Sequence, residues 1–245
     1  MLKRRTVLLG GLITVFGGLP CECSSQTKLG GCAISADAAK RYLGSSVGDQ
    51  DIVNSIVTKS GNKDFDYAAA QTLSVLSDMF EVLPGFAYFK INSRNAFATS
   101  GRLMGKTDGT VLFGSELLFD VLNAPEAPDA IFSGICAHEF AHILQFQRGV
   151  DLNKNQPTAR RGELHADFMA GYFAGARKLQ NSNFPAAVIA VSHGDLGDYD
   201  FNNPQHHGTP AERSAAIVRG FEIAYRDRKK PMEAFDVGIN YAITV

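Results

Sequence analysis

The sequence predicts an α+β fold that is mainly helical, with a small mixed β-sheet and one long buried helix that carries the candidate active site. Apolar residues recur at helical spacing over residues 65–83 and in several stretches beyond residue 128. Between residues 85 and 114, short aromatic or β-branched runs are separated by glycine, asparagine and aspartate, as in strands and turns. The chain has 245 residues and an apolar fraction of 45%, which is enough for one large domain.

The first 23 residues have the layout of a secretory signal peptide. Three basic residues at positions 3–5 precede an apolar run over 6–20, and polar residues follow from Cys21. The apolar run is shorter than the roughly 20 residues that a membrane-spanning helix needs. The arginine pair also resembles a twin-arginine export signal. We therefore expect an exported protein, periplasmic or extracellular, whose mature chain has no stable membrane span; a retained N-terminal anchor ranks second.

Residues 24–36 are small and polar and are expected to form a linker. They include Leu29-Gly30-Gly31-Cys32, which looks somewhat like a lipoprotein cleavage site. However, a polar stretch separates this site from the apolar run over residues 6–20. We therefore rank lipidation below cleavage. Cys23 and Cys32 can form a disulfide in an oxidising compartment, and the pairing among these two and Cys21 stays open. Cys136 lies in an apolar helical stretch, where we expect a buried small side chain.

Residues 37–245 are predicted to form one domain. The chain has 24 basic and 25 acidic residues, and this balance gives no basic face for a nucleic acid. The expected helices cover 37–59 (one or two, capped by Asp37), 65–83 (ended by Pro84-Gly85), 115–122, 128–149, 162–179, 185–192 and 210–225. The expected strands cover 85–91, 95–100 and 109–114, and residues 150–161 are expected to be irregular.

The stretch CAHEFAHILQFQRG, residues 136–149, contains the pattern His-Glu-x-x-His. His138 and His142 are one helical turn apart, so their imidazoles share a face, and two neutral imidazoles at this spacing suit zinc (Zn2+). Glu139 is turned by about 100° around the helix, where it can reach a metal-activated water without being a ligand. The flanking residues are mostly apolar, which indicates a buried helix. The sequence therefore predicts a metal centre on this helix.

A catalytic zinc site needs a third protein ligand, and the stretch RRGELHADFMAGYFAGARKL supplies candidates. Glu163 lies 21 residues after His142, on the next predicted helix, and we expect it to complete the site. Asp167, one turn further, points the same way and can accept the other ring N–H of a zinc-binding histidine. Acidic residues are also favourable in a first helical turn, which is the alternative interpretation. His165 is the rival ligand and ranks lower, because it lies about 200° around the helix from Glu163.

With HEFAH followed by ELHAD, the chain resembles the gluzincin zinc peptidases, specifically the CAAX-prenyl-protease-like family with its HExxH and ExxAD-type motifs. NAFATSG and GTVLFGSELL resemble the strand and short helix before the zinc helix of that family, and HGTPAERSAAIVRGF and Gln145 are similar to the bacterial neutral zinc metallopeptidases. The resemblance covers roughly residues 95–221 and implies a zincin-like domain. It also implies that Asn95–Thr99 form the sheet edge against which an extended substrate lies. The chain lacks the internal spanning helices of the membrane-embedded members, which argues against a prenylated substrate.

We therefore expect an exported zinc-dependent peptidase that acts on a peptide or protein. His138, His142 and Glu163 are the expected zinc ligands. The metal is expected to activate a water and polarise the scissile carbonyl, while Glu139 takes the proton of that water.

Stabilising the tetrahedral oxyanion requires further donors. His207 and Arg213, both in HGTPAER, are the candidates, although a turn histidine and a surface arginine at a helix start would give the same pattern. His193 and His206 have weaker claims.

Two alternatives stay open. One is an exported binding or chaperone-like protein with a structural zinc and no peptidase activity, although structural sites usually have four protein ligands. The other is a non-peptidase zinc hydrolase such as a deformylase, which needs a cysteine ligand from a separate segment. Cys136 fits that role poorly, because it is two residues from His138 on another face of the same helix. The sequence leaves the cleavage specificity and the oligomeric state open.

Overall fold

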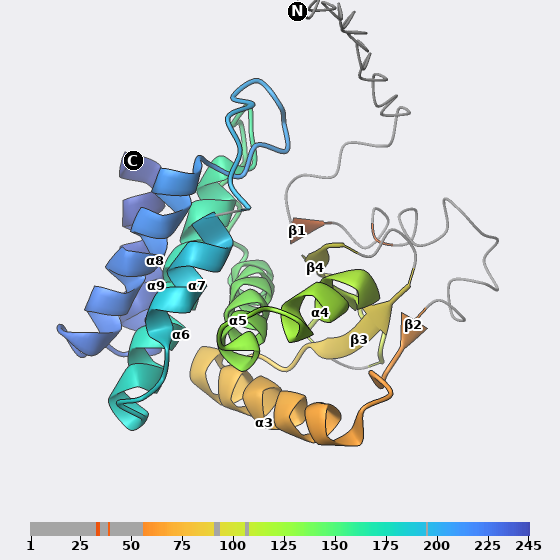
Figure 1. Ribbon diagram of the computed structural model, residues 1–245. Coiled ribbons are helices and arrows are strands. Elements are labelled where there is room, and N and C mark those ends of the chain that lie inside the picture. The colour runs from red at the N-terminus through yellow and green to blue at the C-terminus, as the bar shows by residue number, and fades with distance from the viewer. Residues whose placement is uncertain (1–32, 35–38, 40–55, 91–93, 106–107, 195) are drawn as a thin grey trace, which may run out of the picture.

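One long helix, α5 (Pro128–Gln147), separates a small β-sheet from a group of C-terminal helices (Figure 1). The computed structural model describes residues 33–34, 39, 56–90, 94–105, 108–194 and 196–245. Helices dominate and the sheet is mixed, which confirms the predicted α+β class. The predicted signal peptide, and with it Cys21, Cys23 and Cys32, lies outside the described residues.

Among the described residues, the sheet has five strands in the order β1-β4-β5-β3-β2. They are β1 (Ala33–Ile34), β2 (Ile56–Val57), β3 (Gly85–Phe89), β4 (Ala96–Thr99) and β5 (Thr110–Gly114). β3 and β5 are parallel, as are β1 and β4, whereas the β4–β5 and β2–β3 pairs are antiparallel. All residues of β4 and β5 are buried, because one face of the sheet packs on α5 and the other carries a smaller apolar cluster.

Three predictions that concern the strands are wrong. The edge position expected for Asn95–Thr99 belongs to β1, which pairs with the second half of β4. β1 lies in the stretch expected to be a linker, where two residues give no strand signal until they meet a partner. Ile56–Val57 fall in a region predicted to be helical, yet they form β2 against β3. The rest of residues 37–55 lies outside the described residues except Ala39, which is helical.

The described helices are α3 (Lys63–Phe80), α4 (Ser115–Leu122), α5, α6 (Arg160–Gln180), α7 (Ala186–Gly194), α8 (Pro210–Tyr225) and α9 (Pro231–Thr244). All but α9 begin and end within three residues of the predicted positions. α3 ends before Pro84 because Glu81 takes a left-handed conformation, with φ of 54°. α9 was not predicted: Gly238 and Asn240 weaken its apolar pattern, although Pro231 in its first turn is a typical helix start.

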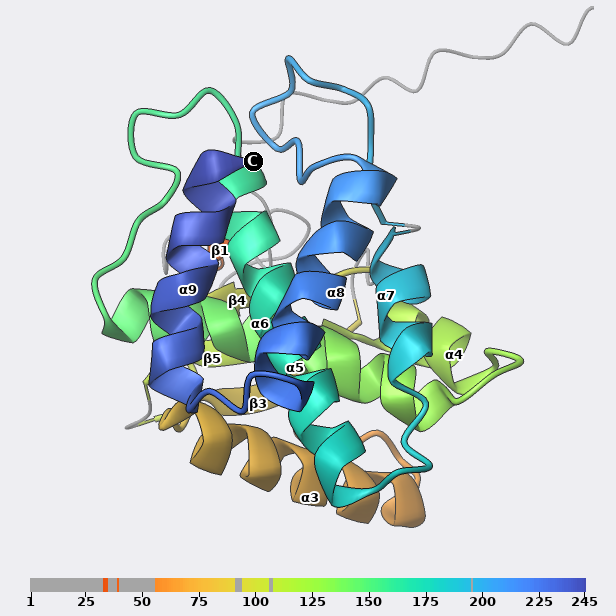
Figure 2. The ribbon, with the colours of Figure 1, turned by 90° about the vertical axis from the view of Figure 1, so that its left-hand side faces the viewer.

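α5 is buried on nearly all sides, because the sheet, α3, α4, α6 and α7 pack around it (Figures 1 and 2). Apolar residues therefore occur all around the helix rather than in one stripe. Its buried polar residues are Ser133, His138, Glu139, His142 and Gln145. Each of these groups loses water on folding, so each needs a partner inside the protein or in a ligand.

α8 runs alongside α6 in very close contact (Figure 2). A Cβ atom at Gly220 would lie 1.8 Å from the carbonyl oxygen of Phe168, and one at Gly171 would lie 2.0 Å from that of Ile217. Only glycine permits this approach, which brings the start of α8 up to the start of α6. Within the described part of the chain, no helix combines the length and the apolar character needed to cross a bilayer.

Candidate metal centre

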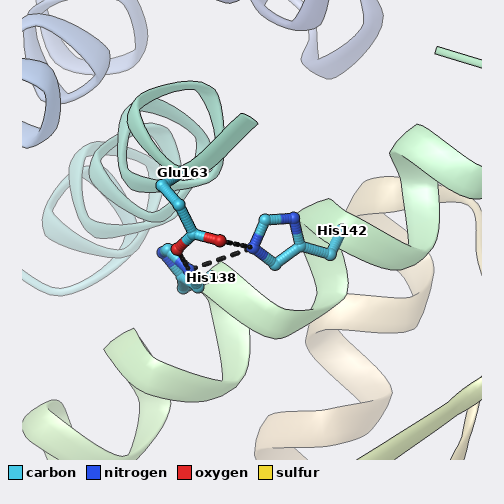
Figure 3. A group of neighbouring side chains, drawn as sticks. All are labelled: His138, His142 and Glu163. Carbon is cyan, nitrogen blue, oxygen red and sulfur yellow. Dashed lines mark hydrogen bonds and ion pairs between the residues drawn. The ribbon is translucent and has the colours of Figure 1, made fainter. Parts of the chain in front are cut away.

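Three buried side chains from two helices converge at the start of α6 (Figure 3). His138 and His142 project from consecutive turns of α5, with ring centroids 4.8 Å apart. Glu163, in the first turn of α6, directs its carboxylate between them. The structure thus brings together the three residues predicted from the sequence to be metal ligands.

The distances between the three side chains fit a tetrahedral metal ion. The two Nε2 atoms of His138 and His142 are 3.1 Å apart, and they lie 3.2 and 3.4 Å from the nearer carboxylate oxygens of Glu163. Zinc–ligand bonds of about 2.0–2.1 Å in tetrahedral geometry place neighbouring donors about 3.3 Å apart. The group can therefore hold a metal ion without rearrangement.

The protons on the two histidines are fixed by acceptors on the far side of each ring. Nδ1 of His138 donates to Oδ1 of Asp167 at 2.8 Å, the contact predicted for Asp167. Nδ1 of His142 lies 2.9 Å from Oε1 of Gln145. With a proton on each Nδ1, both Nε2 lone pairs point toward the carboxylate of Glu163. Three lone-pair donors converge on one point, which is the arrangement that a cation satisfies.

The orientation of the Gln145 amide follows from its other contacts. Its Nε2 lies 3.0 Å from the carbonyl oxygen of Gly162, an obligate acceptor, and 2.9 Å from Nδ1 of His165. Nε2 of His165 donates to the carbonyl oxygen of Phe235 at 3.1 Å. Because both nitrogens of His165 bond to protein groups, it is a positioning residue here, and it does not belong to the ligand group. Burial lowers the pKa of His165 to about 4, so it stays neutral.

Asp167 links the metal centre to α8. Its two carboxylate oxygens lie 2.7 Å from Nε and 2.9 Å from Nη2 of Arg213. Although burial alone would raise it, the pKa of Asp167 lies well below the usual range because of Arg213 and His138. The remaining Nη1 of Arg213 is 3.4 Å from the carbonyl oxygen of Leu196. Arg213 therefore lies behind the ligands and holds Asp167.

Glu139 lies beside the ligands with one carboxylate oxygen buried and without a partner. Oε2 of Glu139 makes no hydrogen bond, and its side chain is almost fully buried. Burial raises the pKa of Glu139 to about 7, against the opposing effect of His138 and His142. A carboxylate with a pKa near neutrality is suited to exchanging a proton. The vacant acceptor of Glu139 is thus the group to which a water beside a metal would donate.

Glu139 and His138 line a cavity of about 130 Å³. Its other walls come from the residues before and at the start of β4, from apolar residues of α4 and α5, and from the α7–α8 region. They are Arg94, Asn95, Ala96, Leu117, Ile135, His193, Leu196, His207 and Arg213. The residues before and at the start of β4 thus border the cavity, although β4 is not an edge strand.

The two neighbouring histidines of the α7–α8 loop have different positions. His207 lines the cavity with a side chain that is 24% exposed, and its backbone N–H donates to Asp198 at 3.2 Å. Although burial alone would raise it, the pKa of Glu163 is held well below its usual range by its interactions with His142, His207 and His138. His206 is buried within the same loop, where its Nδ1 hydrogen-bonds to Oδ1 of Asp198.

Cys136 is buried, as predicted, and burial raises the pKa of its thiol well above the usual range. Among the described residues, neither group of candidate metal-binding atoms includes it. A cysteine-ligated site of the deformylase type therefore has no support in this part of the chain.

The positions of Gln145 and His165 behind the candidate ligands were not predicted from the sequence, in which His165 was only a lower-ranked ligand. A buried amide three residues after His142, on an otherwise apolar helix, is the signal that identifies Gln145. No protein-family model, curated protein or solved structure matches this chain.

Proposed function

We propose that this chain is an exported zinc-dependent peptidase. The observation that carries the proposal is the convergence of the candidate ligands His138, His142 and Glu163 near Glu139, whose buried Oε2 has no partner among the described residues. His138 and Glu139 line the same cavity. The HEFAH and ELHAD motifs, which resemble those of the gluzincin peptidases, point the same way. Export rests on the N-terminal sequence alone, and residues 1–23 lie outside the described part of the chain.

The ligands would be His138, His142 and Glu163. A bound zinc ion would polarise a substrate carbonyl and lower the pKa of a water molecule. Oε2 of Glu139 accepts the proton of the attacking water and then delivers it to the leaving amine, as a general base and acid. Burial of Glu139 matters here, because a carboxylate with a pKa near 7 both takes and returns a proton readily.

His207 and Arg213 have separate roles in this proposal. His207 lines the cavity and is partly exposed, so it can donate a hydrogen bond to the oxyanion formed at the carbonyl carbon. Arg213 acts as a positioning residue: it holds Asp167, which holds the ring of His138. Loss of Arg213 would leave a buried carboxylate without its main cationic partner.

A structural zinc in a protein without peptidase activity is the alternative. Structural zinc sites are closed by four protein ligands. The ligand group in the described residues has three members, and one of them, His138, lines a cavity together with Glu139. These features favour a site open to substrate.

The test is Glu139→Gln. Glutamine matches the shape of glutamate but cannot take up a proton, so the variant should keep zinc and lose about 10²–10⁴-fold in peptide cleavage. Cleavage of a quenched peptide library and zinc content are measured on the same preparations. Glu126→Gln, an exposed change of the same type, is the matched control. Equal cleavage by Glu139→Gln and wild type excludes Glu139 as the base, and zinc retention without any cleavage by wild type favours the structural alternative.

A further inference from the structure

His193, near the end of α7, is a buried histidine in the cavity wall that the proposed mechanism does not use. It is 1% exposed, and its ring centroid lies 5.7 Å from that of His138. One ring nitrogen of His138, one carboxylate oxygen of Asp167 and one ring nitrogen of His193 all lie within 4.8 Å of one another. His193 therefore lies beside the candidate ligand His138 and Asp167, in the wall of the cavity that His138 and Glu139 also line.

The helix backbone fixes the tautomer of His193. Its Nδ1 lies 3.0 Å from the carbonyl oxygen of Ile189, one turn earlier in α7. A carbonyl oxygen only accepts, so Nδ1 carries the proton and Nε2 carries the lone pair. The hydroxyl of Ser192 also lies near Nδ1, at 3.4 Å. His193 thus presents an acceptor and no donor on its remaining nitrogen.

The second ring nitrogen of His193, Nε2, has no hydrogen bond to any described residue. Among the described residues, the fully buried side-chain nitrogen and oxygen atoms without a partner are Oε2 of Glu139 and Nε2 of His206. Nε2 of His193 has no hydrogen-bond partner in the described part of the chain, and His193 itself lines the cavity. Gly134 makes room for the ring, since a Cβ there would lie 3.3 Å from Cε1 of His193.

His165 shows what a purely structural histidine looks like in this protein. Both of its nitrogens bond to protein groups, the Gln145 amide and the Phe235 carbonyl. Among the described residues, His193 has only one nitrogen bonded in this way, and it lines a cavity whose walls also include the apolar residues Ala96, Leu117 and Ile135. The cavity thus offers a hydrogen-bond acceptor that the protein itself does not use.

We propose that His193 is a substrate-binding residue whose Nε2 accepts a hydrogen bond from a backbone amide N–H of the bound peptide. This inference rests on the proposed peptidase function and adds the chemistry of substrate recognition to it. A peptide in extended form has an N–H close to each carbonyl, so a carbonyl at the metal centre brings an amide donor within reach of the adjacent wall. His193 would thereby help to set which carbonyl is presented to Glu139.

Binding is tested first, without turnover. Zinc-loaded Glu139→Gln protein is titrated with peptides of the library, and the 15N resonances of the His193 ring are followed. We expect a protonated Nδ1 before addition and a shift of the Nε2 resonance on peptide binding. The shift should be absent for the same peptide with an ester in place of the donor N–H. An unchanged Nε2 resonance while other resonances move, or a proton on Nε2 in the free protein, overturns the inference.

Kinetics provide the second test. His193→Gln places a carbonyl oxygen near the position of Nε2 and should largely preserve KM, whereas His193→Phe keeps the ring and removes the acceptor. For His193→Phe we expect KM to rise roughly 2- to 12-fold, the effect of one lost hydrogen bond, with a smaller change in kcat. The ester-for-amide change should raise KM for wild type and not for His193→Phe. Ser192→Ala is the control, because it alters the Nδ1 side only.

The results separate the two proposals. If the Nε2 shift appears but wild type cleaves no peptide, the peptidase proposal fails and peptide binding at His193 stands. If wild type cleaves and the ester penalty is the same in His193→Phe, the His193 inference fails and the peptidase stands. If no peptide of the library binds or is cleaved, both are wrong.

Discussion

Gln145 sets the protonation pattern of the metal centre although it is not a ligand. Its NH₂ group is held by the Gly162 carbonyl and by His165, so its oxygen faces Nδ1 of His142 and keeps a proton there. That proton leaves the opposite nitrogen of His142 free to bind a metal. The contact of Asp167 with His138 has the same effect on the other ring. By accepting a hydrogen bond from each Nδ1, Oδ1 of Asp167 and Oε1 of Gln145 leave both Nε2 atoms of His138 and His142 in the state that binds a metal ion.

Gln145→Leu should weaken zinc binding by about 10- to 100-fold, because His142 loses the acceptor that orients it and selects its tautomer. Zinc affinity is measured by competition with a chelating dye. Gln147→Leu is the matched control: Gln147 is the exposed last residue of the same helix, and it donates to the carbonyl oxygen of Asp108 rather than to the candidate metal centre. Equal affinities for the wild type and Gln145→Leu would show that the amide does not orient His142.

Glu139 should make the metal-free protein less stable as the pH rises. Its pKa is about 7 in the folded chain, against an ordinary value of 4.5, because burial disfavours the charged form. The folded state thus binds this proton more tightly than the unfolded state. The free energy of unfolding is therefore unaffected by Glu139 below about pH 4.5 and falls as the pH rises to about 7.

Glu139→Gln should remove this pH-dependent loss in the free energy of unfolding, because glutamine does not ionise. Above about pH 7, the metal-free variant should be more stable than the metal-free wild type by on the order of 3 kcal/mol, and the difference should vanish near pH 4.5. Urea unfolding in the presence of a chelator, at several pH values, measures it. A stability difference that is the same at every pH would contradict the raised pKa.

At the scale of helices and strands, the apolar spacing and the capping residues predicted most of the helices, whose ends depend on neighbouring residues in the sequence. α4 and α8 begin and end at the predicted residues. In α8 the reason is visible, because Thr209 and Glu212 form a capping box around the start of the helix. β1 and β2 have two residues each and are defined by their pairing with β4 and β3. A local sequence pattern therefore does not predict them. The prediction that Asn95–Thr99 form the edge of the sheet was wrong for the same reason, because β1 pairs with β4 at that edge.

The approach of α8 to α6 is an element-scale requirement of the centre, since it carries Arg213 to Asp167. Gly220→Ala would place a methyl group within 1.8 Å of the Phe168 carbonyl oxygen, so the helices must separate. We expect a loss of about 1–3 kcal/mol in the free energy of unfolding or more, because the backbone has to move. Thermal and urea unfolding measure it, and Ala215→Ser on the exposed face of α8 is the control. Wild-type stability of Gly220→Ala would mean that the two helices are less closely packed than described.

At the scale of the whole molecule, the centre lies where the two halves of the fold meet. The sheet, α3 and α4 pack on one side of α5, and α6–α9 pack on the other (Figure 2). His138 and His142 come from the central helix and Glu163 from the C-terminal group. The motif spacing predicted these three residues, because consecutive turns and the next helix are local in sequence. The contribution of Arg213, 46 residues after Asp167, depends on how the helices pack and was predicted only as a candidate without its partner.

Metal removal should therefore destabilise the whole fold rather than one loop. An ion that binds the folded state alone adds RT ln(1 + [L]/Kd), about 2.7 kcal/mol when free zinc is 100 times its Kd. For a chain of 245 residues this corresponds to a rise of roughly 5–10 °C in Tm. Thermal unfolding with zinc and with excess chelator measures the shift. Glu163→Gln is the control, since it weakens the link between α5 and α6 while preserving the shape of the side chain, and its zinc-dependent shift should be much smaller. An equal shift in Glu163→Gln would place the stabilising zinc elsewhere, and no shift in the wild type would mean that this cluster does not hold the ion.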